Sequence, residues 1–180
     1  NASTSPTGSS ASHSSGSTSS KLFSASRPES PASPSWLTAC AFSSNGRSLI
    51  YASSDRAFHL YDTQSDTRLK TLEGHRFIAI RACAFSYDGE IIGSIADDKT
   101  LKLWDRETGK CFLTQKTSRD HIQTCAFSPD GKTIIEGLYN GKIILREING
   151  EYKRQYRGHT DTVNTCIFSS DGRIVSGSRD

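Results

Sequence analysis

The stretch Cys83-Ala-Phe-Ser-Tyr-Asp-Gly89 decides the fold of this chain, because near-copies of it recur at an almost constant interval. Each copy begins with a cysteine, has a phenylalanine two residues later and ends in a glycine that follows Asp or Asn. The four copies are Cys40–Gly46, Cys83–Gly89, Cys125–Gly131 and Cys166–Gly172. Their phenylalanines, at 42, 85, 127 and 168, are 43, 42 and 41 residues apart. Self-similarity at such a period is the signature of a repeat architecture.

Each repeat predicts four short antiparallel strands. The Asp-Gly and Asn-Gly pairs supply the positive φ angles that tight hairpins need. In the second repeat an apolar run at Ile91–Ile95 follows, then a polar turn at Asp97-Asp98, then an alternating strand at Thr100–Trp104. Four strands in roughly 42 residues make one blade of a β-propeller. No stretch has a convincing helical period, so the predicted fold class is all-β.

Composition divides the chain into two parts. Residues 1–35 are dominated by Ser, Thr and Pro and contain few apolar side chains. Such a segment cannot bury enough surface to offset its ordering entropy, so we expect a disordered tail. Residues 36–180 are predicted to hold the repeats. Their predicted boundaries are 36–75, 76–121, 122–159 and a partial fourth repeat at 160–180.

These repeats resemble those of WD40 proteins, over residues 36–180. The second repeat matches best, with Gly74-His75, Ser94, Asp98 and Trp104-Asp105. The resemblance implies that the His, Ser, Asp and Trp of a repeat form a buried hydrogen-bonded network with a structural role. The chemistry is consistent, since a carboxylate accepts from an imidazole, the imidazole accepts from a hydroxyl, and the indole N–H donates to that hydroxyl.

The other repeats depart from this pattern. The fourth has His159, Ser176 and Asp180 for the same network, and the chain ends before its Trp position. The corresponding positions hold Tyr51, Asp55 and Tyr61 in the first repeat, and Glu136, Asn140 and Arg146 in the third. His121 lies out of register and is not counted as a network histidine. Glu136, Asn140 and Arg146 cannot form the same network.

The sequence also bears on whether the propeller is complete. The chain begins with Asn rather than Met and ends at Asp180 inside the pattern, so we interpret it as a fragment or a processed chain. Closed propellers have about 4–8 blades. The sequence predicts an incomplete propeller of about three and a half blades, an open arc with exposed inner faces and strand edges.

The cysteines and histidines indicate structural positions rather than metal ligands. Cys40, Cys83, Cys125 and Cys166 occupy one place in the repeat and are expected to be small buried residues in equivalent strands. Unpaired thiols fit an intracellular location, in the cytoplasm or the nucleus. No histidine has a metal-ligand spacing, so neither a metal nor a cofactor is predicted. His59 is expected at a surface or an edge.

Little in the sequence indicates catalysis. Gly131-Lys132-Thr133 resembles the end of a phosphate-binding loop but lies in a predicted hairpin, not before a helix. The recurring Ser, His and Asp are predicted to be buried and have no visible oxyanion hole. No apolar run of about 18 residues is present, so no membrane span is predicted. The net charge of +3 is mild, and the basic residues near Lys102 alternate with acidic ones, which disfavours nucleic-acid binding.

A partner-binding face can be mapped from the resemblance. In WD40 proteins the contact residues lie six and four residues before the repeat's phenylalanine, and directly before the turn Asp. The first two positions hold Trp36 and Thr38, Ala79 and Arg81, His121 and Gln123, and Thr162 and Asn164. The turn position holds Ser54, Asp97, Tyr139 and Arg179. Trp, Tyr and Arg are enriched at interface hot spots, so Trp36, Arg81, Tyr139 and Arg179 are the predicted partner-binding group.

The predicted function is a non-catalytic scaffold that assembles other proteins through the propeller face. One alternative is a targeting or substrate-recruiting module of a larger protein, in a ubiquitin-ligase or chromatin-associated complex. Ligase adaptors of this family often have Trp-Asp-x-Arg at the end of the third strand. Trp104-Asp105-Arg106-Glu107 has Glu in place of that Arg, which disfavours this alternative without excluding it. A nucleic-acid binder is the third.

Overall fold

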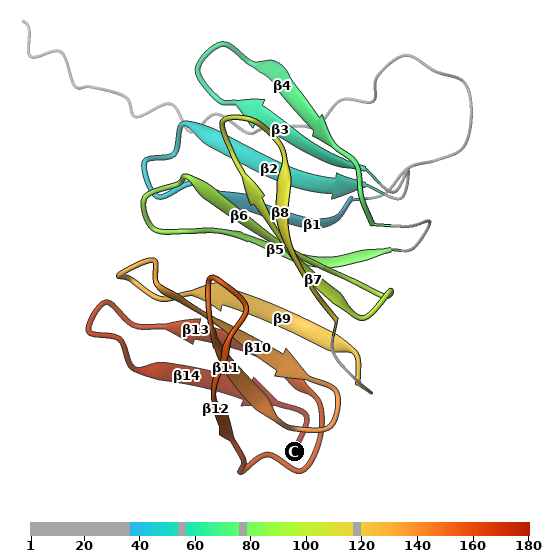
Figure 1. Cartoon of the computed structure of the whole chain (residues 1–180), viewed down its shortest axis with the longest axis vertical. Coiled ribbons are helices and arrows are strands. Elements are labelled where there is room, and N and C mark those ends of the chain that lie inside the picture. Colours follow the sequence, from blue (N-terminus) through green and yellow to red (C-terminus); the bar gives the residue numbers. More distant parts are fainter. Residues whose placement is uncertain (1–36, 54–56, 76–78, 117–119) are drawn as a thin grey trace, which may run out of the picture. The chain divides into compact units, whose positions relative to one another are not determined.

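The computed structural model describes residues 37–180 apart from 54–56, 76–78 and 117–119, and all of these residues belong to one compact unit. The described residues form fourteen β-strands and no helix. The strands make four separate antiparallel sheets that follow one another in chain order (Figure 1). The expectation of a disordered tail at 1–35 lies outside the described residues.

Three sheets have four strands and one has two. The first consists of β1 (Leu37–Phe42), β2 (Ser48–Ser53), β3 (Phe58–Asp62) and β4 (Thr67–Leu72). The second consists of β5 (Ile80–Phe85), β6 (Ile91–Ala96), β7 (Thr100–Asp105) and β8 (Cys111–Lys116). The third consists of β9 (Ile122–Phe127), β10 (Thr133–Leu138), β11 (Ile143–Glu147) and β12 (Tyr152–Tyr156). The fourth consists of β13 (Val163–Phe168) and β14 (Ile174–Ser178).

The repeated motif builds the turn between the first two strands of every sheet. Its glycine has a positive φ in all four copies, for example 77° at Gly89, a conformation that costs glycine little. The hydroxyl of the serine before the turn both donates and accepts a hydrogen bond. In the second sheet the Ser86 hydroxyl donates to the Asp88 carboxylate at 2.5 Å, and its oxygen accepts the Ile91 N–H at 2.9 Å. The hydrogen bond from Ser86 lowers the pKa of Asp88. The Phe-Ser-x-Asp-Gly pattern is therefore a self-closing hairpin turn.

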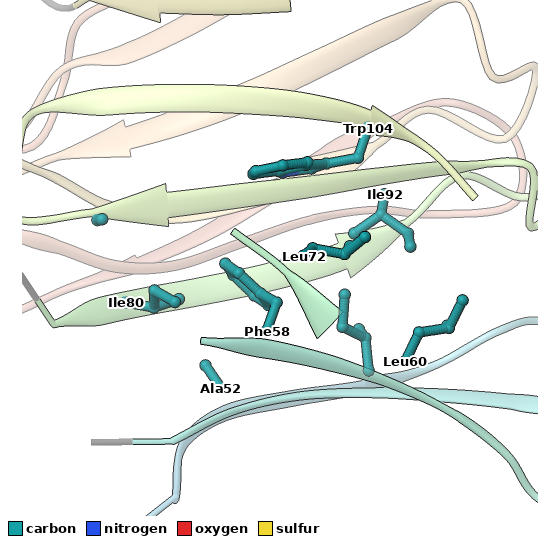
Figure 2. Packing of buried hydrophobic residues seen from close by; sticks show 9 residues of the cluster. Ala52, Phe58, Leu60, Leu72, Ile80, Ile92 and Trp104 are labelled. Atoms are coloured by element: carbon teal, nitrogen blue, oxygen red, sulfur yellow. The ribbon is translucent and has the colours of Figure 1, made fainter. Parts of the chain in front are cut away.

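The apolar core lies between successive sheets. One cluster joins the first two sheets and includes Phe58, Leu72, Ile92 and Trp104, which Figure 2 shows packed between the strands. Two further clusters join the second sheet to the third and the third to the fourth. The innermost strands β1, β5, β9 and β13 contact each other in that order. Sheets stacked face to face around their first strands are the blades of a β-propeller, so the predicted fold class is confirmed, and the sheets are called blades 1 to 4 below.

The neighbours of each blade correct one expectation about the cysteines. Cys125 and Cys166 are buried and Cys83 packs against the first core cluster, but Cys40 is exposed. The three covered cysteines lie in the core between their own blade and the one before it. In the described structure no blade covers that side of blade 1, which leaves Cys40 exposed.

His59 corrects a second expectation, because it is buried rather than at the surface, with 6% of its area exposed. Its ring packs at 5.0 Å from that of Tyr51, and its Nδ1 lies 3.3 Å from the Thr71 hydroxyl. Tyr51 occupies the place that Ser94 has in blade 2. A large ring at that position covers the histidine on the neighbouring strand, which alternation along a single strand does not reveal.

Candidate protein-interaction site

The polar network of blade 2 joins four separate parts of the chain. His75 Nδ1 lies 3.0 Å from Asp98 Oδ2, and His75 Nε2 lies 2.8 Å from Ser94 Oγ. The indole Nε1–H of Trp104 donates to the same Ser94 oxygen at 2.8 Å. The structure thus brings together all four residues that the sequence grouped in this repeat. The network connects the segment before β5 to strands β6 and β7 and to the turn between them.

The electrostatics assign the protons in this network. Burial lowers the pKa of His75, against the opposing hydrogen bond with Asp98, so the ring is neutral near pH 7. Burial raises the pKa of Asp98, but hydrogen bonds from Thr100 and His75 outweigh that effect and hold it below its usual range. A neutral ring donates from Nδ1 to the carboxylate and accepts from Ser94 at Nε2. Ser94 is wholly buried, so this Ser–His–Asp set has a structural arrangement.

The equivalent positions hold an ion pair in blade 3 and a His–Ser–Asp set in blade 4. In blade 3, Glu136 and Arg146 replace Ser94 and Trp104 and form an ion pair, with 3.0 Å between Arg146 Nε and Glu136 Oε1. The Glu136 side chain is fully buried. In blade 4, His159 Nδ1 lies 3.0 Å from Asp180 Oδ1 and His159 Nε2 lies 2.9 Å from Ser176 Oγ. His159, Ser176 and Asp180 are therefore also brought together.

One backbone hydrogen bond recurs at the same end of blades 2, 3 and 4. Its donor is the N–H of the residue directly before the turn Asp or Asn. Its acceptor is the carbonyl oxygen of the residue six positions before the repeat's phenylalanine. The three bonds, each 3.1 Å, are Asp97 N–H to Ala79 O, Tyr139 N–H to His121 O, and Arg179 N–H to Thr162 O. Two of the mapped contact positions are thereby held side by side in every one of these blades.

These positions form an edge of the propeller that we call the rim. Its described members are Thr38, Ala79, Arg81, Asp97, His121, Gln123, Tyr139, Thr162, Asn164 and Arg179. It lies at the end of the blades opposite the Asp-Gly turns, because β5, β9 and β13 begin at the rim and end at those turns.

Side chains on the rim make contacts from blade to blade. The Arg81 guanidinium binds the Asp97 carboxylate through two bonds, at 2.6 and 3.0 Å, and this hydrogen bonding raises the pKa of Arg81. His121 of blade 3 lies 4.0 Å from Asp97 of blade 2, and its ring meets that of Tyr139 edge-on at 5.8 Å. The Thr162 hydroxyl of blade 4 donates to Tyr139 O at 3.2 Å. The rim is therefore one continuous strip across three blades.

The predicted partner-binding residues differ in their exposure and in their contacts. Trp36 lies outside the described residues. Arg81 is paired with Asp97 and is 40% exposed, and Tyr139 is 42% exposed beside His121. Arg179 is exposed on blade 4, joined to the others through Thr162. The chosen group omitted Asp97 and His121, although both occupy mapped positions. The sequence did contain a signal for including Asp97, because Arg81 and Asp97 have opposite charges and both occupy mapped positions.

Metal sites and membrane-spanning helices are two further features that bear on function. Among the residues that the structure describes, no three His, Cys, Asp or Glu side chains are placed to hold a metal ion. The described part of the chain contains no helix that is long and apolar enough to cross a membrane.

Comparison with known protein families gives the family of this chain. The model of the WD domain, G-beta repeat, matches residues 29–62, 66–105 and 150–180, more than half of the sequence. The chain belongs to the WD40 repeat family. The interval that the WD40 model passes over, 106–149, contains most of blade 3. That blade is the one in which Glu136 and Arg146 replace the serine and the tryptophan.

Several curated proteins are similar to this WD40 chain. Pre-mRNA-processing factor 17 of Mus musculus and of Homo sapiens are each 34% identical over 145 residues, which cover 77% of this chain and 25% of the relative. Autophagy-related protein 16 of Arabidopsis thaliana is 29% identical over 142 residues, 78% of this chain and 28% of that protein. Eukaryotic translation initiation factor 3 subunit I of Scheffersomyces stipitis is 31% identical over 118 residues, 63% of this chain and 33% of that protein. The chain spans about a quarter to a third of the length of these relatives.

Proposed function

We propose that this chain is a non-catalytic interaction module that binds other proteins through the rim and helps to assemble a multiprotein complex. The observation that supports the proposal best is the continuity of the rim. Arg81, Asp97, His121 and Tyr139 come from two blades and contact one another at an exposed edge. Aromatic and Arg side chains held in place by a rigid scaffold lose little conformational freedom on binding, which favours affinity.

The chemistry of the rim favours a polypeptide partner of mixed charge. Arg81 and Asp97 already neutralise each other, so the rim presents a paired charge beside an aromatic ring rather than a uniformly basic surface. A phosphate backbone is bound through several uncompensated Lys and Arg side chains. We therefore place nucleic acid behind protein as the partner class.

The setting of this function is also a proposal. All five cysteines are free, which fits a reducing compartment, the cytoplasm or the nucleus. One relative is named a pre-mRNA-processing factor and another a subunit of a translation initiation factor, and both names fit a role within a larger assembly. The alternative role, a targeting or substrate-recruiting module, uses the same rim and differs only in what else the assembly contains.

The rim proposal is tested by affinity capture with the full chain and a matched pair of variants. The test variant changes Trp36, Arg81, Tyr139 and Arg179 to Ala. The control variant changes Tyr87 and Arg173 to Ala, because both are exposed side chains in the turns at the opposite end of the blades. Partners captured by the wild-type chain should be reduced at least about tenfold with the test variant, a loss typical of hot-spot residues. They should be retained with the control variant.

Circular dichroism of both variants establishes that each has the strand content of the wild type. A folded test variant that captures the same partners as the wild type would overturn the assignment of the rim. Loss of capture with the Tyr87 and Arg173 variant alone would place the binding surface at the other end of the blades.

A further inference from the structure

The outer strand of blade 2 differs in charge from the outer strands of blades 1 and 3. In blade 1, β4 contains Arg68 and Lys70. In blade 3, β12 contains Lys153 and Arg154. Charged side chains on an edge strand hinder the addition of a further strand. The residues of β8 are Cys-Phe-Leu-Thr-Gln-Lys, with a charge at the last position alone, so β8 is the least protected of the three described outer strands.

The backbone of β8 has a free edge. Among the described strands it pairs with β7 alone, at the outside of a sheet with the order β5, β6, β7, β8 (Figure 1). Core clusters join blade 2 to both blade 1 and blade 3. The β11–β12 turn of blade 3 lies against one face of β8, where a Cβ atom added at Gly150 would lie 3.1 Å from Leu113 Cδ1. The edge is therefore exposed with both neighbouring blades in place, and an exposed strand edge is a template for strand addition.

A bulge turns one apolar side chain of β8 outward. The register between β7 and β8 shifts by one residue, and Phe112 is the extra residue. Bulges re-aim a side chain away from the regular pleat, and Phe112 is 52% exposed. The same bulge holds Leu69 in β4 and Lys153 in β12, so the fold does not require an aromatic ring at this place. Phe112 thus presents apolar surface on the edge strand itself.

Lysines lie along the middle and the C-terminal end of β8. The Lys102 ammonium, from the neighbouring strand β7, donates to Thr114 Oγ1 at 2.8 Å, which holds its charge over the middle of β8. Lys116 is the last residue of the strand and is exposed. An acidic partner segment is therefore attracted to this half of the strand, and salt screens the attraction.

The N-terminal end of β8 is balanced in charge. The turn before it contains two acidic and two basic residues, Asp105, Arg106, Glu107 and Lys110. Phe112 follows this turn directly after one further residue, so the apolar contact and the unbalanced lysines lie in different halves of the strand. This order distinguishes the two directions in which a partner strand can add.

We propose that the outer edge of β8 binds an extended acidic segment of a partner protein, which adds a fifth strand to blade 2. The segment runs antiparallel to β8. Its first residues are acidic and lie beside Lys116 and Lys102, and an apolar residue later in the segment lies beside Phe112. Backbone hydrogen bonds supply the affinity, and these side chains select the sequence. The site is separate from the rim residues and goes beyond the proposed function, because it is a second surface on a single blade.

The test uses a synthetic peptide, Glu-Ser-Glu-Val-Thr-Val-Thr-Val, with a fluorophore on its N-terminus and an amide at its C-terminus. Its glutamates come first, as antiparallel addition to β8 requires, and its valines alternate with threonines as in a strand. Fluorescence anisotropy with the full 180-residue chain should show saturable binding of one peptide per chain. A peptide with Lys in place of both glutamates should bind at least about fivefold more weakly at low salt, because Lys102 and Lys116 repel it.

Backbone methylation distinguishes strand addition from attraction by charge alone. Successive residues of a strand present their N–H groups to opposite edges, so one alternate set faces β8 and the other faces solvent. Two further peptides have N-methyl groups either on the valines or on the threonines. One of them should lose binding at least about tenfold, because its hydrogen bonds to β8 are removed, and the other should retain most of its binding.

Two variants of the chain and a matched control link this binding to β8. Phe112→Ala removes the exposed ring and should weaken binding about tenfold, the loss typical of an aromatic anchor. Lys102→Ile, which introduces the residue type of Ile144 at the equivalent position of blade 3, should weaken binding about threefold. Leu69→Ala, the same kind of truncation at the bulge of β4, should leave binding unchanged. Circular dichroism verifies that all three variants are folded.

The exposed thiol of Cys111 reports on occupancy of the edge. Cys111 precedes Phe112 in β8, and Cys40 in β1 is exposed as well. Because alkylation requires an accessible thiol, saturating peptide should slow the reaction of Cys111 with iodoacetamide at least about fivefold, measured by mass spectrometry of the digested chain. Cys40 should react at an unchanged rate, which makes it an internal control.

Four results would overturn the proposal. One is absence of saturable binding by the folded wild-type chain, and another is equal binding by the Phe112→Ala chain. The third is equal binding by the two N-methyl peptides, since that result would exclude backbone pairing with β8. The fourth is a wild-type chain that sediments as a dimer and a Phe112→Ala chain that sediments as a monomer, which would assign the edge of β8 to a second copy of this chain.

Discussion

Blades 2 and 3 stabilise the same place in the fold with different chemistry. In blade 2 a neutral hydrogen-bonded network joins Ser94 and Trp104 to His75, whereas in blade 3 a buried ion pair joins Glu136 to Arg146. The strand order is the same in both blades. Because the strands and turns are equal while the network is not, the network is not what specifies the blade. The hairpin turns and the apolar faces between blades specify it.

Blades 2 and 3 differ in whether every polar side-chain atom at these positions has a hydrogen-bond partner. Every polar side-chain atom of Ser94, His75 and Trp104 has a partner in the blade 2 network. In blade 3, Glu136 Oε2 is buried without a hydrogen-bond partner, and burial raises the pKa of Glu136 although Arg146 opposes this. A buried ion pair with one unsatisfied oxygen contributes little net stability. We therefore expect blade 3 to tolerate replacement of the whole pair but not of one partner.

The largest expected effect follows from Arg146→Ala. This change leaves the fully buried Glu136 without its cation, and we expect it to lower the free energy of unfolding by about 3–5 kcal/mol, measured by urea denaturation. Replacing both residues, as Glu136→Leu with Arg146→Met, should be neutral or stabilising by about 1–4 kcal/mol. If the double variant is as unstable as Arg146→Ala, the ion pair is a stabilising element and the contrast between the blades is wrong.

A smaller effect compares Gly74 of blade 2, which faces the Trp104 ring, with the equivalent glycine of blade 4, Gly158. Gly74→Ala should destabilise the chain by about 1–3 kcal/mol through overpacking, because the new methyl group meets the Trp104 ring. Gly158→Ala, at the equivalent position of blade 4, meets open space and should change stability by less than about 0.5 kcal/mol. Thermal melts of the two variants measure the difference. Equal melting temperatures would contradict the close packing of Gly74 against the Trp104 ring.

The smallest expected effect is a pH dependence that blade 2 contributes through His75. Because burial lowers the pKa of His75 in the folded state, the unfolded chain binds more protons below the ordinary histidine pKa of about 6.5. The stabilising contribution is complete above that pH and is lost as the pH falls through the lowered pKa. Urea denaturation between about pH 7.5 and about pH 5 should show a steeper loss of stability for the wild type than for His75→Gln. Parallel curves would contradict a neutral buried His75.

Local features of the fold were predictable from the sequence, while features that depend on neighbours were not. The Phe-Ser-x-Asp-Gly turns lie within a few residues of chain, so their strands could be placed from turn chemistry alone. The exposure of Cys40 and the burial of His59 depend on which blade or ring covers them. The Glu136–Arg146 pair joins residues ten apart on neighbouring strands, and only the opposite charges at the two network positions hinted at it.

The rim shows the same division. Two of its positions in each of blades 2, 3 and 4 followed from the repeat, and the same backbone hydrogen bond holds them side by side there. The pairing of Arg81 with Asp97 and the packing of His121 on Tyr139 depend on side-chain geometry between blades. As a result the predicted partner-binding group named Arg81 without its carboxylate partner Asp97.

Hydrogen–deuterium exchange of the full chain, alone and bound to a partner obtained by affinity capture, tests the assignment of the rim most directly. The account predicts that the partner slows exchange at the rim segments around Asp97, His121, Tyr139 and Arg179. The turns at the opposite end, around Tyr87, Asp130 and Asp171, should exchange at unchanged rates. Protection confined to those opposite turns would contradict the claim that this WD40 chain binds proteins through its rim.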